Sequence, residues 1–372
     1  MKLTFSNISS DEAPVMVRIG VMPDSSSEKE AKKGLGNLLM LAHPLHLQLL
    51  SKDEGNVTVL KHFKYRSIDG GLVGVVGDSW MLEAEHVPVS WHSTRGVNQD
   101  SYDEIKQALC RDVGALCSSK IANTSSACYG KSIARAARLA GIAEEQWGGL
   151  INKLGSDDDI EENLFGFYNN CHSLLGYFVY GIAVLAKIDP NWDSDVGRYQ
   201  YNSGEAVNAI YSAALMGLAY NDANLVAIGS TLAALEIHAA QMWCHLKMDD
   251  RKCSDEFTME NRFAPWEEHR LAAHVLPLLP ITEFLFSNVG FVKEVVEWTM
   301  PCLNRDGVGE ILKGLVYARE GIYDNEAALK KVGELPSFDS PRSTLSDLLW
   351  WLHSRRGQED HHQDSCYSNF KL

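Results

Sequence analysis

Residues 225–243 read LVAIGSTLAALEIHAAQMW, a predicted helix whose apolar residues cover most of its girth. Helices of this kind are buried by neighbours on several sides, so we expect a multi-helix barrel or toroid and not a simple bundle. Helical periodicity extends over nearly all of the chain after residue 170. The predicted helices are 175–188, 205–220, 222–247, 268–287 (broken at Pro277 and Pro280), 289–299, 309–322, 325–334 and 343–355.

The first 95 residues have a different pattern. Short runs rich in β-branched residues, separated by turn residues, are typical of a β-sandwich. The predicted strands lie in VMVRIGVM (15–22), VTVLKHFKY (57–65), LVGVVGDSWML (72–82) and VPVSWHS (87–93). From about residue 100 the period becomes helical, in 101–116 and 131–147. The chain therefore reads as β first, then mixed, then helical.

The amino-acid composition limits the classes of binding partner that we expect. The 372 residues include 34 Lys and Arg against 49 Asp and Glu, a net charge of −15. That balance argues against nucleic acid and an acidic membrane surface, and it suits a neutral partner such as an uncharged sugar polymer. No apolar run reaches the roughly 18 residues of a membrane span. The N-terminus lacks the apolar core of a signal peptide, so a cytoplasmic or non-classically exported protein is expected.

Neither a cofactor nor a metal is expected. The sequence contains no GxGxxG, Walker A or HExxH motif, and its eight cysteines form no CxxC pair, which favours free thiols. His238 and His245 are seven residues apart on one predicted helix, about two turns, too far for neighbouring ligands. We interpret both as packing or hydrogen-bonding residues.

Polar and aromatic residues cluster where the apolar helices begin, in 168–192 and 197–220, and again in 235–247. Polar groups at helix starts around a barrel mouth can converge on one cleft, and aromatic faces stack on sugar rings. The alternative is that the aromatic residues are core and Glu205 is a helix-start charge favoured by the dipole. The candidate ligand-binding residues are Tyr168, His172, Tyr177, Gln200, Trp243 and His245.

Several long segments resemble glycoside hydrolase family 81, the endo-β-1,3-glucanases, whose plant members include β-glucan elicitor-binding proteins. The similar segments are EAPVMVRIGVMPD (12–24), VVGDSWML (75–82), YGKSIARAARLA (129–140), 168–190, 197–209, EIHAAQMW (236–243), LPLLPITE (276–283), GFVKEVVEW (290–298) and LLWWLHSR (348–355). They occur in order over most of 1–356.

The resemblance implies an architecture and a reaction. It implies an inverting glucan endo-1,3-β-D-glucosidase acting on a laminarin-like β-1,3-glucan. It also implies an N-terminal β-sandwich, a small connecting α/β region and a C-terminal (α/α)6-type helical barrel. The corresponding ranges are 1–95 (a partial sandwich), 96–155 and 156–356, followed by a polar tail at 357–372.

Two departures fall on the positions that would perform catalysis. The family's acid, the Asp of a YNDHH motif, corresponds to Asn170, and its base, the first Glu of QESTSE, corresponds to Tyr201. An amide delivers no proton, and a phenol of pKa about 10 is a poor base near neutral pH. The second Glu is retained as Glu205, and His172 is retained from the histidine pair. Impaired hydrolysis is therefore expected.

The chain is also shorter than the family pattern. A long insert is missing between Trp192 and Gly197, and further stretches between Glu144 and Trp147 and near Arg262, so the barrel is expected to be incomplete. Three interpretations stay open: a hydrolase, a catalytically inactive β-1,3-glucan-binding protein, and a shortened product without a stable fold. The sequence does not set the oligomeric state.

Overall fold

The structure is a computed structural model that describes residues 2–5, 15–20, 38–51, 56–67, 70–84, 87–118, 126–147, 171–188, 206–243, 277–304, 308–335 and 343–355. The chain divides into two compact units, residues 1–89 with 210–246 and residues 90–209 with 247–372.

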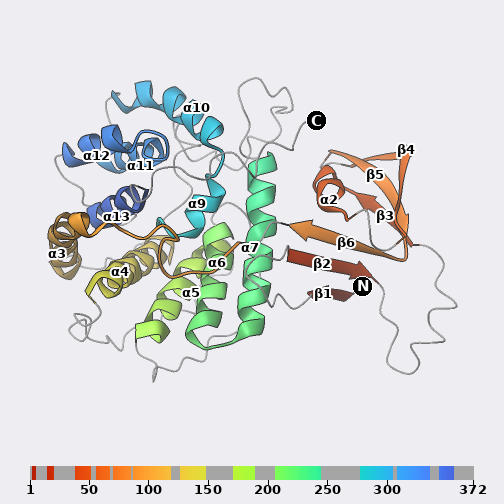
Figure 1. Cartoon of the computed structure of the whole chain (residues 1–372), viewed down its shortest axis with the longest axis horizontal. Helices are drawn as coiled ribbons and strands as arrows, with labels where there is room; N and C mark the ends of the chain where they lie inside the picture. The colour runs from red at the N-terminus through yellow and green to blue at the C-terminus, as the bar shows by residue number, and fades with distance from the viewer. Residues whose placement is uncertain are drawn as a thin grey trace. The chain divides into compact units, whose positions relative to one another are not determined.

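The first unit contains two antiparallel three-stranded sheets, with strand orders β1-β2-β6 and β3-β5-β4 (Figure 1). The strands are β1 (Lys2–Phe5), β2 (Val15–Gly20), β3 (Leu38–Ala42), β4 (Thr58–Ser67), β5 (Gly70–Gly77) and β6 (Ser79–Ala84). A short helix, α2 (Pro44–Leu49), contacts β3, β5 and β6. Ala42 and Val75 are fully buried, so one face of the β3-β5-β4 sheet contributes to a small core.

Two long helices complete this unit. Helix α6 (Ala206–Ala219), which belongs to this unit from Ile210 onward, and helix α7 (Ala223–Trp243) form a tight antiparallel hairpin. A methyl group on Gly229 would lie 2.7 Å from Cβ of Ala214, so the glycine permits the close approach. Helix α7 contacts β2 and β6, and the Ser230 hydroxyl donates to the Val87 carbonyl at 2.7 Å. By length and composition, Ala223–Met242 is apolar enough to cross a membrane, a test that core helices also pass.

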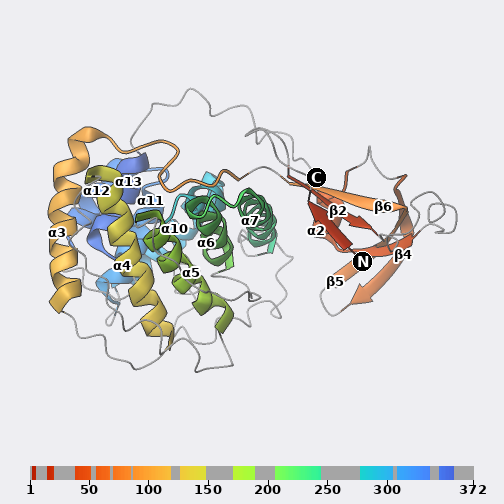
Figure 2. The same ribbon diagram turned by 90° about the horizontal axis from the view of Figure 1, so that it is seen from below.

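The second unit is helical in its described part. Its α-helices are α3 (Tyr102–Ser118), α4 (Ser126–Trp147), α5 (Cys171–Ile188), α9 (Ile281–Leu285), α10 (Val289–Thr299), α11 (Glu310–Glu320), α12 (Asn325–Gly333) and α13 (Leu345–Arg355). Figure 2 shows α4 and α5 side by side, in agreement with the contacts between the two helices. Helix α13 contacts α3, α4, α11 and α12, and its Leu348, Trp350 and Leu352 are fully buried. It is therefore the central helix of this unit.

Most predicted elements are confirmed, and the differences have local causes. Helix α10 has the predicted bounds, and the other predicted helices after residue 170 agree within a few residues except 268–287. There the described part contains only α9, after Pro277 and Pro280. The predicted strand 72–82 is two strands, β5 and β6, separated at Asp78.

The prediction of a strand at 87–93 is wrong. The Val87 carbonyl accepts a hydrogen bond from Ser230 instead of a neighbouring strand, and the Ser90 side chain bonds the backbone of His92. The sequence patterns also did not predict β1, β3 or α2. In the range where a connecting α/β region was expected, the described residues 96–118 and 126–147 contain helices and no strand.

Candidate functional site

The structure leaves most of the predicted site residues undescribed. Those outside the described residues are Tyr168, Asn170, Gln200, Tyr201, Glu205 and His245. His172 and Trp243 lie in α5 and α7, but their side chains are not described. Tyr177 is buried, at 5% exposure, and its ring centre lies 5.7 Å from Nζ of Lys131. Its predicted contact with a ligand stays a prediction.

The described helices nevertheless constrain where the two motif segments lead. Helix α5 begins at Cys171, directly after Asn170, and α6 begins at Ala206, directly after Glu205. A methyl group on Gly176 would lie only 2.3 Å from Cβ of Ala209. At a rise of 1.5 Å per residue, this contact is about 7.5 Å along α5 from its start and about 4.5 Å along α6. Both helix starts therefore flank one contact.

Helix α5 is also held against α4, and the two run in the same direction. Lys131 lies over Tyr177 near one end of the pair, and Lys187 forms an ion pair with Glu144 near the other. Between these ends, a methyl group on Gly181 would meet Cγ2 of Ile133 at 2.6 Å. The start of α5 is thus fixed by two helices, α4 and α6.

A chain of buried polar groups connects the start of α6 with α13 and α4. Asn208 donates through Nδ2 to the Pro277 carbonyl at 3.0 Å. The next amide, of Leu278, donates to Oδ2 of Asp347 at 3.0 Å, and Oδ1 of Asp347 accepts from Nε of Arg138 at 2.7 Å. We name Asn208, Leu278, Asp347 and Arg138 the buried chain. Its side chains are nearly inaccessible.

Burial changes the pKa values of ionisable side chains in and beside the buried chain. The guanidinium of Arg138 stacks on the Trp350 ring at 3.8 Å from its centre. Burial raises the pKa of Asp347, and the nearby Arg138 partly offsets that effect. Burial also raises the pKa of Tyr180 to about 12, against the attraction of Arg138. A buried ion pair of this kind depends on both partners being present.

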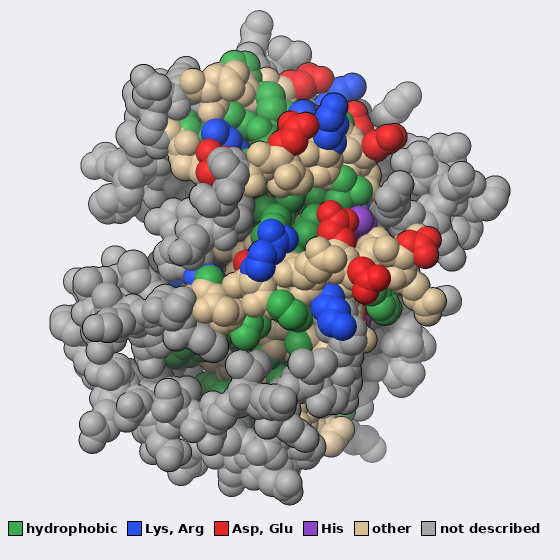
Figure 3. All heavy atoms as spheres, turned by 90° about the vertical axis from the view of Figure 1, so that its left-hand side faces the viewer, with side chains coloured by type: hydrophobic (Ala, Val, Ile, Leu, Met, Phe, Trp, Pro, Cys, Tyr) green, Lys and Arg blue, Asp and Glu red, His purple; other side chains and the backbone are tan. Residues whose placement is uncertain are grey.

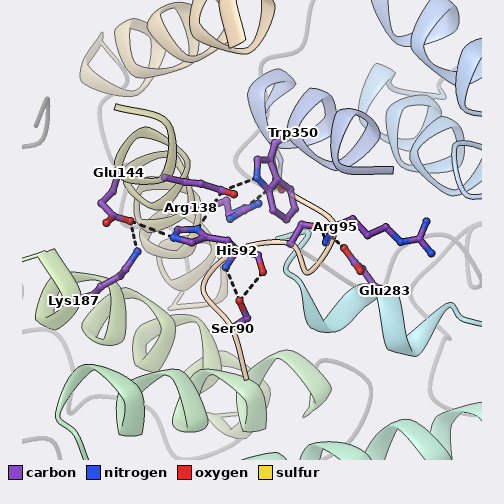
Figure 4. A network of polar contacts seen from close by, with 11 residues as sticks. Ser90, His92, Arg95, Arg138, Glu144, Lys187, Glu283 and Trp350 are labelled. Carbon is purple, nitrogen blue, oxygen red and sulfur yellow. Dashed lines mark hydrogen bonds and ion pairs between the residues drawn. The ribbon is translucent and has the colours of Figure 1, made fainter. Parts of the chain in front are cut away.

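A half-exposed polar cluster holds the segment that opens this unit (Figure 4). His92 lies between two carboxylates, with Nδ1 at 3.4 Å from Oε2 of Glu145 and Nε2 at 3.9 Å from Oε2 of Glu144. Glu145 also accepts from Nε1 of Trp350 at 2.8 Å. Lys187 neutralises Glu144 and lies 5.1 Å from the centre of the Trp91 ring. The cluster ties residues 90–92 to α4, α5 and α13.

Glu283 of α9 forms a second tie to the same segment. It accepts from the hydroxyls of Ser93 at 2.8 Å and Thr94 at 3.3 Å, and it forms an ion pair with Arg355. Arg355 stacks on Trp351, at 3.9 Å from the ring centre. LPLLPITE and LLWWLHSR, two of the segments that carry the family resemblance, thus meet through Glu283 and Arg355.

A hydroxyl, an imidazole and a carboxylate line up elsewhere in this unit. Oγ of Ser101 lies 2.8 Å from Nδ1 of His353, whose Nε2 lies 2.8 Å from Oε2 of Glu104. A nucleophilic triad needs an accessible hydroxyl. Here Ser101 is buried and the Glu104 side chain is 56% exposed, so the order of exposure is inverted. The arrangement therefore fastens α13 to α3.

Metal ligands do not gather in the described ranges: no group of three or more His, Cys, Asp or Glu side chains there is placed to hold an ion.

Comparison with known proteins supports a glycoside hydrolase. The chain matches the glycosyl hydrolase family 81 C-terminal domain over residues 142–201 and 193–351, and the N-terminal domain of that family over 26–93. A Glycine max protein named glucan endo-1,3-beta-D-glucosidase is 42% identical, over 95% of this chain and 71% of that protein. The chain therefore belongs to glycoside hydrolase family 81.

A solved structure supports the same fold. A glycoside hydrolase family 81 protein from Clostridium thermocellum superimposes with a TM-score of 0.66 at 13% identity, over 96% of this chain. This chain spans 60% of the length of that protein. The likeness concerns the fold alone.

The comparisons also support the internal shortening. The match to the Glycine max protein runs over 478 positions, and 95% of the 372 residues of this chain fill no more than about 353 of them. At least about 120 positions of the relative thus lie opposite gaps in this chain. The two pieces that match the C-terminal domain overlap at 193–201, which is where the sequence analysis places a long missing segment.

Proposed function

We propose that this chain is an endo-1,3-β-glucanase-type protein that binds β-1,3-glucan where α5 and α6 begin. The observation that carries the proposal is the contact of Gly176 with Ala209, since it brings together the helix starts that follow the two motif segments. Family membership supports the ligand class. The named activity of the Glycine max relative supports it too.

We further propose that α5 and the later helices, within residues 156–356, correspond to an incomplete (α/α)6-type barrel, and the two sheets to a partial β-sandwich. The match to the C-terminal domain of the family, over 142–201 and 193–351, supports the assignment of these helices to one domain. The shortened match across 193–201 supports its being incomplete.

Hydrolysis with inversion needs an acid to protonate the leaving oxygen and a carboxylate to activate water, about 6.5–9.5 Å apart. At the corresponding positions this chain has Asn170 and Tyr201. Glu205 remains as a carboxylate that can bind a hydroxyl or polarise water, but it does not supply both groups. We therefore propose that glucan binding is retained and hydrolysis is impaired.

These two substitutions specifically favour a second candidate function, a catalytically inactive β-1,3-glucan-binding protein. In that case His172, Tyr168 and Gln200 would contact the sugar without a reaction. The two candidates share a cleft and differ only in turnover.

Restoring the missing acid and base tests which of the two candidate functions is correct. We expect Asn170→Asp with Tyr201→Glu to hydrolyse laminarin faster than either single variant, because each half of an acid–base pair is useful mainly when the other is present. Glu205→Gln in the double variant should lower the rate again. The measurement is reducing-sugar release, with binding checked by retardation in laminarin gels. A folded, glucan-binding double variant without turnover would refute the assignment of these positions and leave the binding protein.

A further inference from the structure

The outer strand β4 carries a cluster of cations that is unusual for so acidic a chain. Residues 61–66 read KHFKYR and are all exposed. Strands β3, β4 and β5 contain no Asp or Glu, while the chain as a whole has a net charge of −15. Among the described residues, Lys61, Lys64 and Arg66 form no ion pair. We name residues 61–66 the basic edge.

The pairing of β4 with β5 places an aromatic ring and two of the cations on opposite faces of the sheet. Residues directly opposite each other in an antiparallel sheet point to the same face. Tyr65 pairs with Leu72, whereas Lys64 pairs with Val73 and Arg66 with Gly71, so Tyr65 lies on one face and the two cations on the other. Because β4 is the outer strand of the described sheet, both rows border the same edge of that sheet (Figure 1).

The aromatic row lies on an apolar face of the sheet. The register shifts between Leu60 and Lys64, and in this irregular stretch Phe63 covers a glycine. A methyl group on Gly74 would lie 2.7 Å from Cδ1 of Phe63, so the ring rests on bare backbone. Phe63 is 48% exposed, Tyr65 56% and the neighbouring Leu39 51%. Apolar side chains that gather in the open on one face are a common feature of interaction sites.

Charged side chains on another face of the protein are arranged differently from those of the basic edge. On the face drawn in Figure 3, which includes α3 and α12, acidic and basic side chains are interspersed. Interspersed charges make a solvated surface, whereas uncompensated charges of one sign attract a partner of the opposite sign. The basic edge therefore has a charge that calls for an anion, next to rings that favour a flat apolar partner.

We propose that the basic edge binds an anionic polysaccharide, a polyuronate with one carboxylate on each sugar. The rings of Phe63 and Tyr65 stack against sugar faces, and Lys61, Lys64 and Arg66 pair with carboxylates. Residues on one face of a strand recur about every 6.7 Å, which suits a sparse polyanion. DNA carries one charge per about 1.7 Å, and would bring many more phosphates against an otherwise acidic chain. The site is independent of the proposed glucan cleft.

The test uses the full chain and labelled oligogalacturonate. We expect binding whose affinity falls about twentyfold between about 50 and 200 mM salt, as counterion release at some three contacts requires. Replacing Lys61, Lys64 and Arg66 together with Gln should weaken binding by at least about tenfold, and Tyr65→Ala should weaken it where Tyr65→Phe does not. Lys293→Gln with Lys330→Gln, two exposed lysines on α10 and α12, is the matched control.

Several results would overturn the proposal. One is absence of binding at low salt, and another is equal binding by the triple variant. Equal affinity for single-stranded DNA or phosphatidylserine vesicles, unaffected by Tyr65→Ala, would indicate general attraction to anions. Lysines on outer strands also prevent edge-to-edge aggregation. A triple variant that aggregates yet keeps its affinity would therefore show that protection of the edge is their role. Laminarin binding should be unchanged in the triple variant, which separates this site from the glucan cleft.

Discussion

The buried chain behind the starts of α5 and α6 and the motif residues ahead of them differ in what the sequence retains. In the buried chain, Asp347 has both Arg138 and the amide of Leu278 as partners, and Asn208 ties α6 to Pro277. Ahead of the helices, the proposed acid and base positions hold Asn170 and Tyr201. The packing that positions a cleft can persist when its reactive groups are replaced, so likeness of fold does not by itself imply turnover.

The largest effect should come from breaking the buried chain. Arg138→Met leaves the Asp347 carboxylate buried without its cation, which costs about 3–5 kcal/mol of unfolding free energy. Lys313→Met, which removes the partly exposed ion pair with Glu310, is the matched control and should change little. Urea unfolding measures both. Equal losses for the two variants would mean that the buried chain does not hold this unit together.

A smaller effect should follow from separating the helix starts. Gly176→Ala places a methyl group against Ala209 and should cost about 1–3 kcal/mol by overpacking, with weaker laminarin binding. Gly114→Ala in α3 has no atom within 4 Å of the new methyl group and should stabilise by about 0.5–1 kcal/mol. If Gly176→Ala is as stable as the wild type and binds laminarin equally, the contact does not position the cleft.

The smallest effect concerns pH. Burial raises the pKa of Asp112, although Ser346 and two arginines oppose the shift. The folded state then binds this proton more tightly than the unfolded state, so stability from this group increases as the pH falls toward the ordinary value of 3.8.

Asp112→Asn should therefore lose more stability than the wild type when the pH is lowered from 7 to about 4.5. Melting temperatures at the two pH values measure this difference, with the exposed Asp103→Asn as the control. The opposite sign, with the variant losing less stability, would contradict the raised pKa.

Local patterns predicted local structure well. Helix α10 begins and ends as predicted because Asn288 caps its first turn and apolar residues recur on one face. Strand β3 and helix α2 were missed because LLMLAHPLHLQLL (38–50) is almost continuously apolar, without the alternation that identifies a strand.

Contacts between distant segments were not predictable. Arg138 and Asp347 are 209 residues apart, and His92 meets Glu144 and Glu145 only through the fold. VPVSWHS (87–93) alternates like a strand, yet its backbone forms hydrogen bonds with the side chains of Ser230 and Ser90. The proposed acid and base positions came from resemblance, because nothing in the period of the chain distinguishes Asn170 or Tyr201 from their neighbours.

The most direct test of the account is to measure binding and turnover of laminarin by the pure wild-type chain in parallel. Affinity electrophoresis should show retardation by laminarin that salt hardly changes, since no counterions are released on binding a neutral polymer. A reducing-sugar assay on the same sample should show no release above background. Release of sugar by the pure chain would mean that the catalytic positions are not residues 170 and 201, and absence of retardation would contradict glucan binding itself.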